Sequence, residues 1–581
     1  MGPFESGDVP VIVGRLAVAV AWHHPWLNRA CHPRAPLKID YAASAMRVLM
    51  VNWAPIALGA SMGGGVNGYA FALAHELMGR GHTLFALSSG LTYSPDAWLR
   101  RPGPTHIRRL ESVEGIETYD VVNSPVVAPS WFQFRNPLGE VANLELESKI
   151  LDLLRSLDLD VVHLHNIEGL TAGVIPAIKA MGATGKRPAI VYSLHNYHTV
   201  CPQIYLIQKA ARVCENFENG HACVACVNAP SHVAEIRTRV DRSLARVVFA
   251  DPKVEGQDIA LPVLETGARK WLAGFASTPE AARPVPERFE APASSNAIDE
   301  SVGTPFDNTI HPEPKSTREP NEYARRRFAM VRALNACDRV LAVSRFVADK
   351  FEGLGVASDR IETLAIGTTM TGHATAMLDS RGKIYKPPEA SNTGFSRPIR
   401  LAFLGYHNVA KGLPVLVAAL ESLEPSIARA FDLSVHAKDV ASITPRLRRL
   451  ASKLARVVVE GEYAHTDIPI LVKDIDLGVV PSAWWDNGPQ TVLEFLACGV
   501  PVLASNAGGI PDVIAHNHNG LLFRANDVAA LAETLRDLVA NPSTLATLRA
   551  NVTPPKSMSD HAPEIERVYA DAIAHRDEPT M

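Results

Sequence analysis

The stretch DLGVVPSAWWDNGPQTVLEFLACGVPVLAS, residues 476–505, decides the fold that the sequence predicts. It opens with a continuous apolar run, passes through a polar loop and a helical segment, and returns to a second apolar run. Continuous apolar strands that alternate with helices are typical of parallel sheets covered on both faces. The stretch therefore predicts one strand–helix–strand unit of a doubly wound α/β domain.

The same pattern extends in both directions from this unit. In the C-terminal half, further strands are expected at residues 400–405, 433–436 and 457–460. In the N-terminal half, strands are expected at residues 46–52 and 82–88 and in two runs that end at His165 and His195. The expected fold class is α/β, with two doubly wound, Rossmann-like domains.

The composition limits the class of protein. A chain of 581 residues suggests roughly two to four domains, and 47% hydrophobic with 20% charged residues is ordinary for a globular protein. The formal net charge of −4 argues against a dedicated nucleic-acid binder, because such proteins gain affinity by neutralising phosphates. No apolar run reaches the roughly 18 residues of a membrane span, and seven cysteines at this length do not suit a small disulfide scaffold. The expected location is the cytoplasm.

A glycine-rich loop follows the first expected strand. Gly63, Gly65 and Gly68 satisfy the spacing G-x-G-x-x-G, which predicts a dinucleotide-binding turn. However, the turn that starts at Asn52 is longer than this motif needs, and the next strand ends near Ser88 without an acidic residue for a ribose. We favour a loop whose backbone N–H groups approach an anionic ligand, and a plain turn of small residues is the alternative.

Two acidic residues frame the loop and helix of the opening stretch. Asp486 lies in the loop and Glu494 in the helix, eight residues further on. Ligands of open α/β sheets bind beyond the carboxyl ends of the strands, so both carboxylates are expected to face that region and to accept hydrogen bonds from sugar hydroxyls. The structural alternative is a charge favoured by the helix dipole plus an exposed glutamate.

These residues resemble a known family. Residues 481–499 resemble the E-x7-E motif of the retaining glycosyltransferases of family 4, and FLGYHNVAKGL at residues 403–413 resembles their G-x5-K-G segment. Further matching segments are the glycine-rich loop, SLHN at 193–196, LAVSRFVADKFEGLG at 341–355, and VPVLASNAGGIPDVI at 500–514 with Gly508, Gly509 and Asp512. The resemblance covers residue 46 to about residue 574. It implies the GT-B architecture, in which two Rossmann-like domains face a central cleft.

The resemblance also implies roles for individual residues. Lys411 would be the cation for the donor diphosphate, Glu494 would bind the ribose, and Asp486 would bind the hydroxyls of the donor sugar. His195 would be the histidine next to the sugar; a structural hydrogen bond is its alternative, and His163 and His165 rank below it. The donor-binding set is then Gly64, Gly65, Lys411, Asn487, Gly488 and Glu494, and the catalytic pair is His195 and Asp486.

Two positions depart from the family pattern. Asp486 stands where the family usually has a glutamate, and Tyr406 stands where it usually has an arginine. Loss of a guanidinium weakens diphosphate binding unless another cation replaces it. A non-catalytic nucleotide-sugar-binding protein and a GT-B sugar-nucleotide epimerase are therefore the alternatives to a transferase.

No divalent metal and no other cofactor is expected to be required for catalysis. A cation and helix N-termini can meet the leaving diphosphate. The two D-x-D pairs, Asp158/Asp160 and Asp474/Asp476, precede strands and so belong to the opposite edge of the sheets, and we discard them as Mg²⁺ or Mn²⁺ ligands. No carboxylate is an obvious nucleophile, which favours a front-face displacement.

Four cysteines fall within 26 residues, with the spacing C-x12-C-x8-C-x2-C. They are Cys201, Cys214, Cys223 and Cys226. One interpretation is a tetrahedral structural zinc site, for which His198 and His221 are substitute ligands. The alternatives are a redox or disulfide pair and unrelated buried cysteines.

The expected organisation has two domains and four additional segments. Residues 1–45 are an N-terminal extension expected to be disordered, residues 46–366 an acceptor-side domain, 367–398 a linker, 399–560 the nucleotide-sugar-binding domain, and 561–581 a C-terminal helix and tail. An insertion at about 201–320 is expected to carry the cysteines at one end and to be disordered at the other.

The expected function follows from the resemblance. It is a retaining, nucleotide-diphosphate-sugar-dependent hexosyltransferase that acts on an acceptor hydroxyl in cell-surface polysaccharide or glycolipid synthesis. Its partners would be the nucleotide sugar and a saccharide or lipid-linked acceptor, with no nucleic acid. A lipid-linked acceptor would bring the enzyme into peripheral contact with the inner face of the membrane.

Overall fold

The computed structural model describes residues 45–93, 103–183, 185–208, 212–227, 302–314, 316–370, 390–391 and 394–576. Residues 1–44 of the expected extension, residues 228–301 of the insertion, most of the expected linker, and residues 577–581 of the tail lie outside them. The predictions of disorder made for the extension and for residues 228–301 therefore concern parts of the chain that the structure does not describe.

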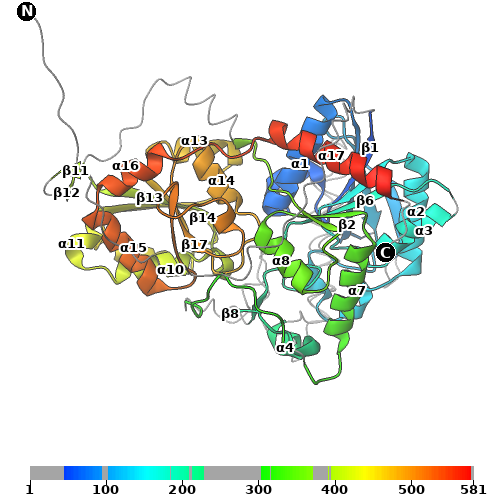
Figure 1. Cartoon of the computed structure of the whole chain (residues 1–581), viewed down its shortest axis with the longest axis horizontal. Helices are drawn as coiled ribbons and strands as arrows, with labels where there is room; N and C mark the ends of the chain where they lie inside the picture. Colours follow the sequence, from blue (N-terminus) through cyan, green and yellow to red (C-terminus); the bar gives the residue numbers. More distant parts are fainter. Residues whose placement is uncertain are drawn as a thin grey trace, which may run out of the picture. The chain divides into compact units, whose positions relative to one another are not determined.

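The first sheet has eight strands in the order β10-β9-β6-β5-β1-β2-β4-β3. All neighbouring pairs are parallel except β3 and β4. The strands are β1 Arg47–Val51, β2 Thr83–Thr92, β3 His106–Arg109, β4 Glu117–Val122, β5 Val161–Leu164, β6 Ala189–Leu194, β9 Arg339–Ala342 and β10 Ile361–Thr363. The helices of this half are α1 Gly64–Gly79, α2 Leu144–Leu157, α3 Val174–Ala180, α7 Glu322–Ala336 and α8 Arg345–Gly353 (Figure 1).

The second sheet has six parallel strands in the order β15-β14-β13-β16-β17-β18. They are β13 Ile399–Tyr406, β14 Phe431–Lys438, β15 Arg456–Glu460, β16 Leu477–Val480, β17 Val502–Asn506 and β18 Gly520–Arg524. The helices of this half are α10 Leu413–Glu421, α11 Pro425–Ala428, α12 Thr444–Leu450, α13 Ile468–Leu471, α14 Gln490–Ala497, α15 Val528–Ala540 and α16 Ser543–Ala550.

Hydrophobic cores form on both faces of the second sheet. Along β13, Leu401 and Phe403 belong to one buried cluster, while Ala402 and Leu404 belong to another. Successive side chains of a strand point to opposite faces, so the two clusters lie on the two sides of the sheet. One contains residues of α10, α12 and α15, and the other contains residues of α13 and α14. The prediction of doubly wound α/β domains is confirmed, and the unit at residues 476–505 is β16, α14 and β17.

The last helix, α17 Met558–His575, packs against the first sheet although it follows the second in the chain. Figure 1 shows it beside α1. Glu566 accepts two hydrogen bonds from the guanidinium of Arg80, at 2.7 and 2.8 Å, and lies 2.8 Å from His82 Nε2. Tyr569 is fully buried against His163 at 2.7 Å. The helix that was expected to belong to a tail is therefore part of the core of the first half.

Residues 302–314 and 316–320 differ from the expectation of disorder. The N–H of Phe306 donates to the carbonyl of Ala525 at 3.1 Å, and the Phe306 ring is buried edge-on against Trp485. Asn308 exchanges two hydrogen bonds with the backbone of Gly508, at 2.6 and 3.0 Å. One aromatic side chain and backbone pairing suffice to place this segment against the second sheet, even though large apolar residues are few.

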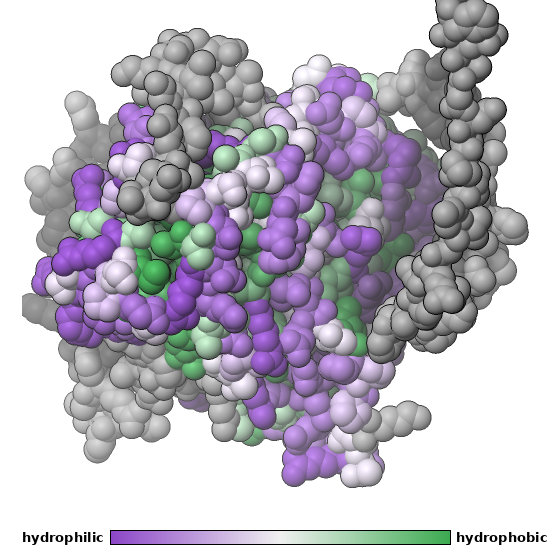
Figure 2. All heavy atoms as spheres, turned by 60° about the vertical axis from the view of Figure 1, so that its left-hand side comes forward, coloured by the Kyte–Doolittle hydropathy of each residue, from purple (hydrophilic) through white to green (hydrophobic). Residues whose placement is uncertain are grey.

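On the face drawn in Figure 2, hydrophilic side chains predominate and hydrophobic patches lie between them. Within the part of the chain that the structure describes, no helix is long and apolar enough to cross a bilayer.

Candidate active site

Lys411 lies in the loop after β13, at the carboxyl end of the second sheet. The side chain of Asn408 accepts the backbone N–H of Lys411 at 2.8 Å and caps a short 3-10 helix there. Gly412 follows with a φ of 70°, and a Cβ at this position would collide with the carbonyl of Pro481. The glycine therefore allows the lysine loop to lie directly against the loop that follows β16.

Asp486 lies in that second loop and is 4% exposed. Its Oδ2 accepts a hydrogen bond from Ser482 Oγ at 3.2 Å and lies 3.9 Å from Lys411 Nζ. The carbonyl of Asp486 accepts the N–H of Gly509 at 2.7 Å, so the glycine turn after β17 holds the backbone. The structure thus brings the predicted sugar-binding acid and the predicted diphosphate cation together. Ser482 was not among the predicted residues.

Glu494 lies in the second turn of α14 and is 7% exposed. Its Oε1 lies 3.2 Å from Nε2 of His465, a residue in the loop after β15. Among the described residues, Glu494 and Asp486 have different neighbours, His465 for the first and Ser482 with Lys411 for the second. His465 was missed because nothing in its local sequence distinguishes it from other loop residues.

Asn487 and Gly488 separate the acidic loop from the helix. Asn487 is 1% exposed, and neither atom of its amide has a hydrogen-bond partner among the residues that the structure describes. A buried amide without partners is costly, which is typical of a group that serves a ligand. Gly488 lies against Val343 and Ile366, which come from the chain of the first half, so the acidic loop lies where the two halves meet.

The glycine-rich loop of the first half contacts the start of α14, next to the acidic loop. The helix α1 begins at Gly64, after Gly63 with a φ of 78°. Gln490, the first residue of α14, donates from Nε2 to the carbonyl of Gly65 at 2.8 Å, and a Cβ on Gly65 would collide with that side chain. The N-termini of α1 and α14 therefore lie side by side, and their unpaired N–H groups favour an anion between them.

Asn67 holds the glycine-rich loop from inside. Its side chain is fully buried, accepts from Asn52 Nδ2 at 2.9 Å, and donates to the carbonyls of Pro55 and Gly59 at 2.9 Å each. These bonds hold the turn whose length argues against a dinucleotide-binding motif. Asn67 was not among the predicted residues, although its position inside the glycine motif could have indicated a role in the loop.

His195 follows β6 and lies in a cluster of aromatic and imidazole rings. Its Nε2 lies 3.3 Å from His165 Nδ1, and its ring centre lies 4.9 Å from that of Tyr69. His165 Nε2 is buried without a hydrogen-bond partner in the described part of the chain. His163 is further inside, bonded to Tyr569 and to Ser193 Oγ at 2.8 Å. The three predicted histidines are therefore neighbours, and only His163 is fully satisfied.

Burial keeps these imidazoles neutral. Desolvation, together with the repulsion of neighbouring histidines, lowers the pKa of His195 to about 3 and that of His163 to about 3. It lowers the pKa of His165 well below the usual range as well. At neutral pH His195 can therefore exchange hydrogen bonds, but it carries no positive charge.

The segment after His195 reaches the acidic loop. Tyr197 is fully buried, its ring lies edge-on to Trp484 at 6.0 Å, and burial with the nearby charge of Asp486 raises the pKa of its hydroxyl well above the usual range. Its hydroxyl has no hydrogen-bond partner among the described residues. The end of β6 and the loop after β16 thus form one continuous wall.

Tyr406, which stands in place of the family's arginine, is 38% exposed beside Lys411. Its ring centre lies 5.6 Å from Lys411 Nζ, a weak cation–π contact. Its hydroxyl lies 3.4 Å from the hydroxyl of Tyr205, whose ring is edge-on to Trp484 at 4.8 Å. Two tyrosines, Tyr406 and Tyr205, therefore lie beside Lys411 at the predicted diphosphate position.

The two D-x-D pairs lie at the amino ends of strands, away from Lys411 and Asp486. The carboxylate of Asp160 accepts the backbone N–H of Arg47 at 2.9 Å, and Asp476 accepts two hydrogen bonds from Arg397 at 2.6 and 2.9 Å. Both carboxylates thus have structural partners at the amino edge. An open cavity of about 600 Å³ between β18 and α15 contains none of the predicted site residues.

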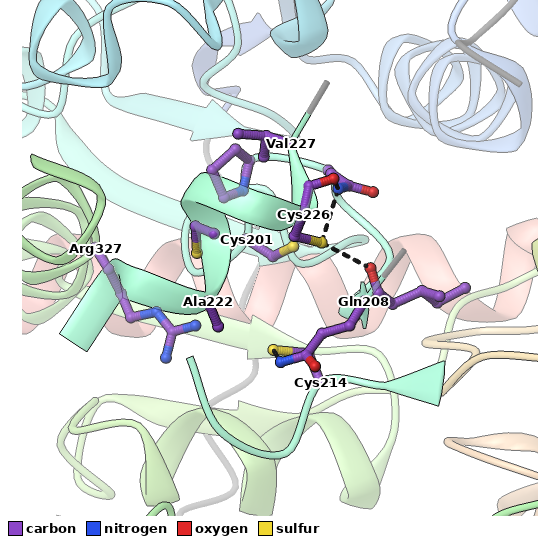
Figure 3. A pocket seen from close by; sticks show the side chains of 11 residues that line it. Cys201, Gln208, Cys214, Ala222, Cys226, Val227 and Arg327 are labelled. Carbon is purple, nitrogen blue, oxygen red and sulfur yellow. Dashed lines mark hydrogen bonds between the residues drawn. The ribbon is translucent and has the colours of Figure 1, made fainter. Parts of the chain in front are cut away.

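The four clustered cysteines line one small cavity (Figure 3). Burial raises the pKa of Cys214 to about 11 and that of Cys223 to about 12. His198 is turned away: its Nε2 lies 2.9 Å from Arg326, and His221 Nε2 lies 2.9 Å from the carbonyl of Glu319. The two substitute ligands considered from the sequence therefore do not line the cavity.

The comparison with protein families matches the second half. Residues 398–541 match the model of the family described as glycosyl transferases group 1. An alpha-maltose-1-phosphate synthase of Mycolicibacterium smegmatis is 28% identical over 230 residues, which are 36% of this chain and 56% of that protein. A D-inositol 3-phosphate glycosyltransferase 1 of Catenulispora acidiphila is 29% identical over 226 residues, 37% of this chain and 52% of that protein. The chain thus spans about half the length of these curated relatives.

The comparison with solved structures shows the fold. A sucrose-phosphate synthase from Thermosynechococcus elongatus superposes with a TM-score of 0.51 at 14% identity, covering 91% of this chain and 99% of that structure. The prediction of a GT-B architecture is confirmed, and residues 398–541 match the glycosyl transferases group 1 family. The chain carries a glycosyl transferases group 1 domain, built into a GT-B fold.

Proposed function

We propose that the protein is a retaining glycosyltransferase of family 4 that transfers a sugar from a nucleotide-diphosphate sugar to an acceptor hydroxyl. The observation that carries the proposal is the pairing of Lys411 with buried Asp486 beside the N-termini of α1 and α14. Lys411, Asp486 and α14 lie in the domain that matches the glycosyl transferases group 1 family. Both curated relatives bear names of enzymes that form glycosidic products, which supports the same reaction class.

The donor diphosphate would lie between the two helix N-termini. Lys411 supplies a positive charge there, and the N–H groups at Gly64 and Gly65 supply hydrogen-bond donors. These groups stabilise the charge that develops on the diphosphate as the glycosidic bond breaks. Glu494 would then accept the ribose hydroxyls, in competition with its present neighbour His465.

The sugar of the donor would lie against the acidic loop. Asp486 accepts its hydroxyls, and the unpartnered amide of Asn487 next to Gly488 offers a donor and an acceptor to the same ring. His195, neutral and at the end of β6, offers a hydrogen bond on the side of the acceptor-side domain. Asp486 and His195 are the residues we place at the reacting carbon.

Retention of configuration would follow from a front-face displacement. The bond between the anomeric carbon and the diphosphate oxygen breaks, and the acceptor oxygen forms a bond to the same face of that carbon. The acceptor proton passes to the leaving diphosphate oxygen, so no protein nucleophile and no metal step is needed. We further propose that the acceptor belongs to a cell-surface polysaccharide or glycolipid.

The test measures nucleoside diphosphate release from UDP-, GDP- and ADP-sugars in the presence of saccharide and lipid-linked acceptors. We expect turnover with one donor, retention of the anomeric configuration by NMR, and loss of activity in Glu494→Ala. Lys186→Ala is the matched control, because Lys186 pairs with Asp158 and Asp160 at the opposite edge of the first sheet. Donor binding without turnover would show a binding protein, and an epimerised sugar nucleotide without acceptor would show an epimerase; either result overturns the proposal.

A further inference from the structure

The four cysteines come from three separate local structures that meet at one point. Cys201 follows the turn after β6, Cys214 directly follows the short hairpin of β7 Ile207–Gln208 and β8 Arg212–Val213, and Cys223 and Cys226 lie on α4 His221–Cys226. All four line the same cavity, and Figure 3 shows the sulfurs of Cys201 and Cys226 directed toward each other. Their convergence is a property of the fold and not only of the C-x-x-C motif.

The cavity has the size and the chemistry of a metal site. Its volume is about 20 Å³, which is room for about one water-sized particle. Two amides donate to the sulfurs: Gln203 Nε2 lies 3.0 Å from Cys226 Sγ, and Gln208 Nε2 lies 3.3 Å from Cys214 Sγ. N–H donors of this kind orient and tune metal-bound thiolates. Arg327 also lines the cavity, where its guanidinium is paired with Glu313 at 2.9 Å.

Binding of a metal ion would require rotation of cysteine side chains about χ1. As placed, no three His, Cys, Asp or Glu side chains among the described residues form a ready-made metal-binding group. Each sulfur lies one rotatable bond from its backbone, so a χ1 change moves it into or out of the cavity without moving the chain.

The loop between the first two cysteines carries backbone strain. Ile204 has a φ of 62° and Leu206 a φ of 50°, in a region that a β-branched residue and a leucine rarely adopt. Such strain persists only where the surroundings hold the loop in place. Between these two residues lies Tyr205, which contacts Tyr406 and Trp484 of the candidate active site.

We propose that Cys201, Cys214, Cys223 and Cys226 bind one structural zinc ion, and that this site holds Tyr205 against Tyr406 and Trp484. Zinc with four thiolates is the ordinary closed, tetrahedral structural site, and it requires no redox step. The ion closes the ends of the strained loop and so positions one wall of the donor pocket. The second half of this statement rests on the proposed function; the zinc site itself does not.

The first experiment measures metal content by mass spectrometry on the full chain, purified under reducing conditions without added metal. We expect about one zinc per chain in the wild type and in Cys337→Ala, whose cysteine lies buried in the first half, away from the cavity. The double variant Cys223→Ser/Cys226→Ser should contain none. Zinc that persists in the double variant, iron in place of zinc, or a wild-type chain with two disulfides and no metal would each overturn the proposal.

The second experiment avoids variants that fail to fold. Wild-type protein is treated with a chelator and then given back zinc, while limited proteolysis reports on residues 201–227. Cleavage within this segment should increase on chelation and reverse with zinc; unchanged cleavage after proven zinc loss contradicts the proposal.

The third experiment tests the position of Tyr205. Zinc removal and Tyr205→Ala should each raise the KM for the donor about tenfold with a smaller change in kcat, and their combination should add little. Independent, additive effects would contradict the link between the ion and Tyr205. If zinc is bound but no donor is turned over, the proposed function fails while the metal site stands.

Discussion

Asp476 and Asp486 are two buried aspartates of one strand–helix unit. They lie at opposite ends of β16 and differ in the partners of their carboxylates. Asp476, 2% exposed, is saturated: Arg397 binds both of its oxygens, and the backbone N–H of Arg400 donates to it at 2.8 Å. Asp486, 4% exposed, has a serine at 3.2 Å and a lysine only at 3.9 Å.

The amino and carboxyl edges of the sheets show the same contrast between polar groups with hydrogen-bond partners and polar groups without them. At the amino edge of the first sheet, Asp338 accepts two hydrogen bonds from Arg187 at 2.7 and 2.9 Å. At the carboxyl edge, the amide of Asn487 and the hydroxyl of Tyr197 have no partners among the described residues. Loss of one partner from a fully hydrogen-bonded buried carboxylate lowers stability. A buried polar group without a partner already lowers stability, and it is available to bind a ligand.

The largest effect is expected for Lys411→Ala at the carboxyl edge. Removal of the cation that meets the leaving diphosphate should lower kcat/KM by about 100- to 1,000-fold. The free energy of unfolding should change little, because the side chain is partly exposed. Kinetics of nucleoside diphosphate release measure this, with Lys186→Ala as the amino-edge control. An equal loss in the control would remove the distinction between the two edges.

A comparable effect, on stability, is expected for Asp476→Asn at the amino edge. This change leaves Arg397 without its carboxylate and should cost about 3 kcal/mol of the free energy of unfolding. Asp486→Asn should cost less than about 1 kcal/mol and lower activity instead. Urea unfolding of both variants measures the difference; a reversed order would refute the assignment of structural and functional aspartates.

The buried histidine His163 should make the first half sensitive to acid. Its pKa is lowered to about 3 by burial, while an unfolded histidine titrates near 6.5, so the unfolded state binds more protons between these values. Stability therefore falls as the pH drops below about 6.5, by about 1 kcal/mol per pH unit for this residue. Urea unfolding at pH 7 and pH 5 should show a shallower loss in His163→Gln. Parallel pH profiles of variant and wild type would contradict this.

The smallest effect is expected for Tyr406→Arg, which restores the family's usual residue. A guanidinium beside the ammonium of Lys411 should tighten binding of a nucleoside diphosphate by about 1 kcal/mol. Calorimetry with UDP, GDP and ADP measures it, and Tyr406→Leu controls for the loss of the contact to Tyr205. Unchanged affinity in Tyr406→Arg would show that the diphosphate does not lie beside Tyr406.

Much of the candidate site was predictable because it is local. Lys411 and Asp486 each follow an apolar strand closely, and the strand pattern alone places such residues at a carboxyl edge. Ser482 and His465 were missed because their roles depend on contacts that no periodicity announces. The expectation of disorder after residue 301 was wrong for the described part of that segment, because Phe306 pairs with Ala525, a residue far along the chain.

The two doubly wound domains, and the edge of each sheet at which a ligand is expected, could be predicted from the amino-acid sequence. Both follow from short-range patterns of apolar residues, glycines and acids, which act over a few turns of chain. Three arrangements could not be predicted in this way: α17 packs on the first sheet, Gln490 contacts Gly65, and four cysteines share one cavity. These contacts join segments separated by up to several hundred residues. They depend on the packing of whole surfaces, which a local sequence pattern does not predict.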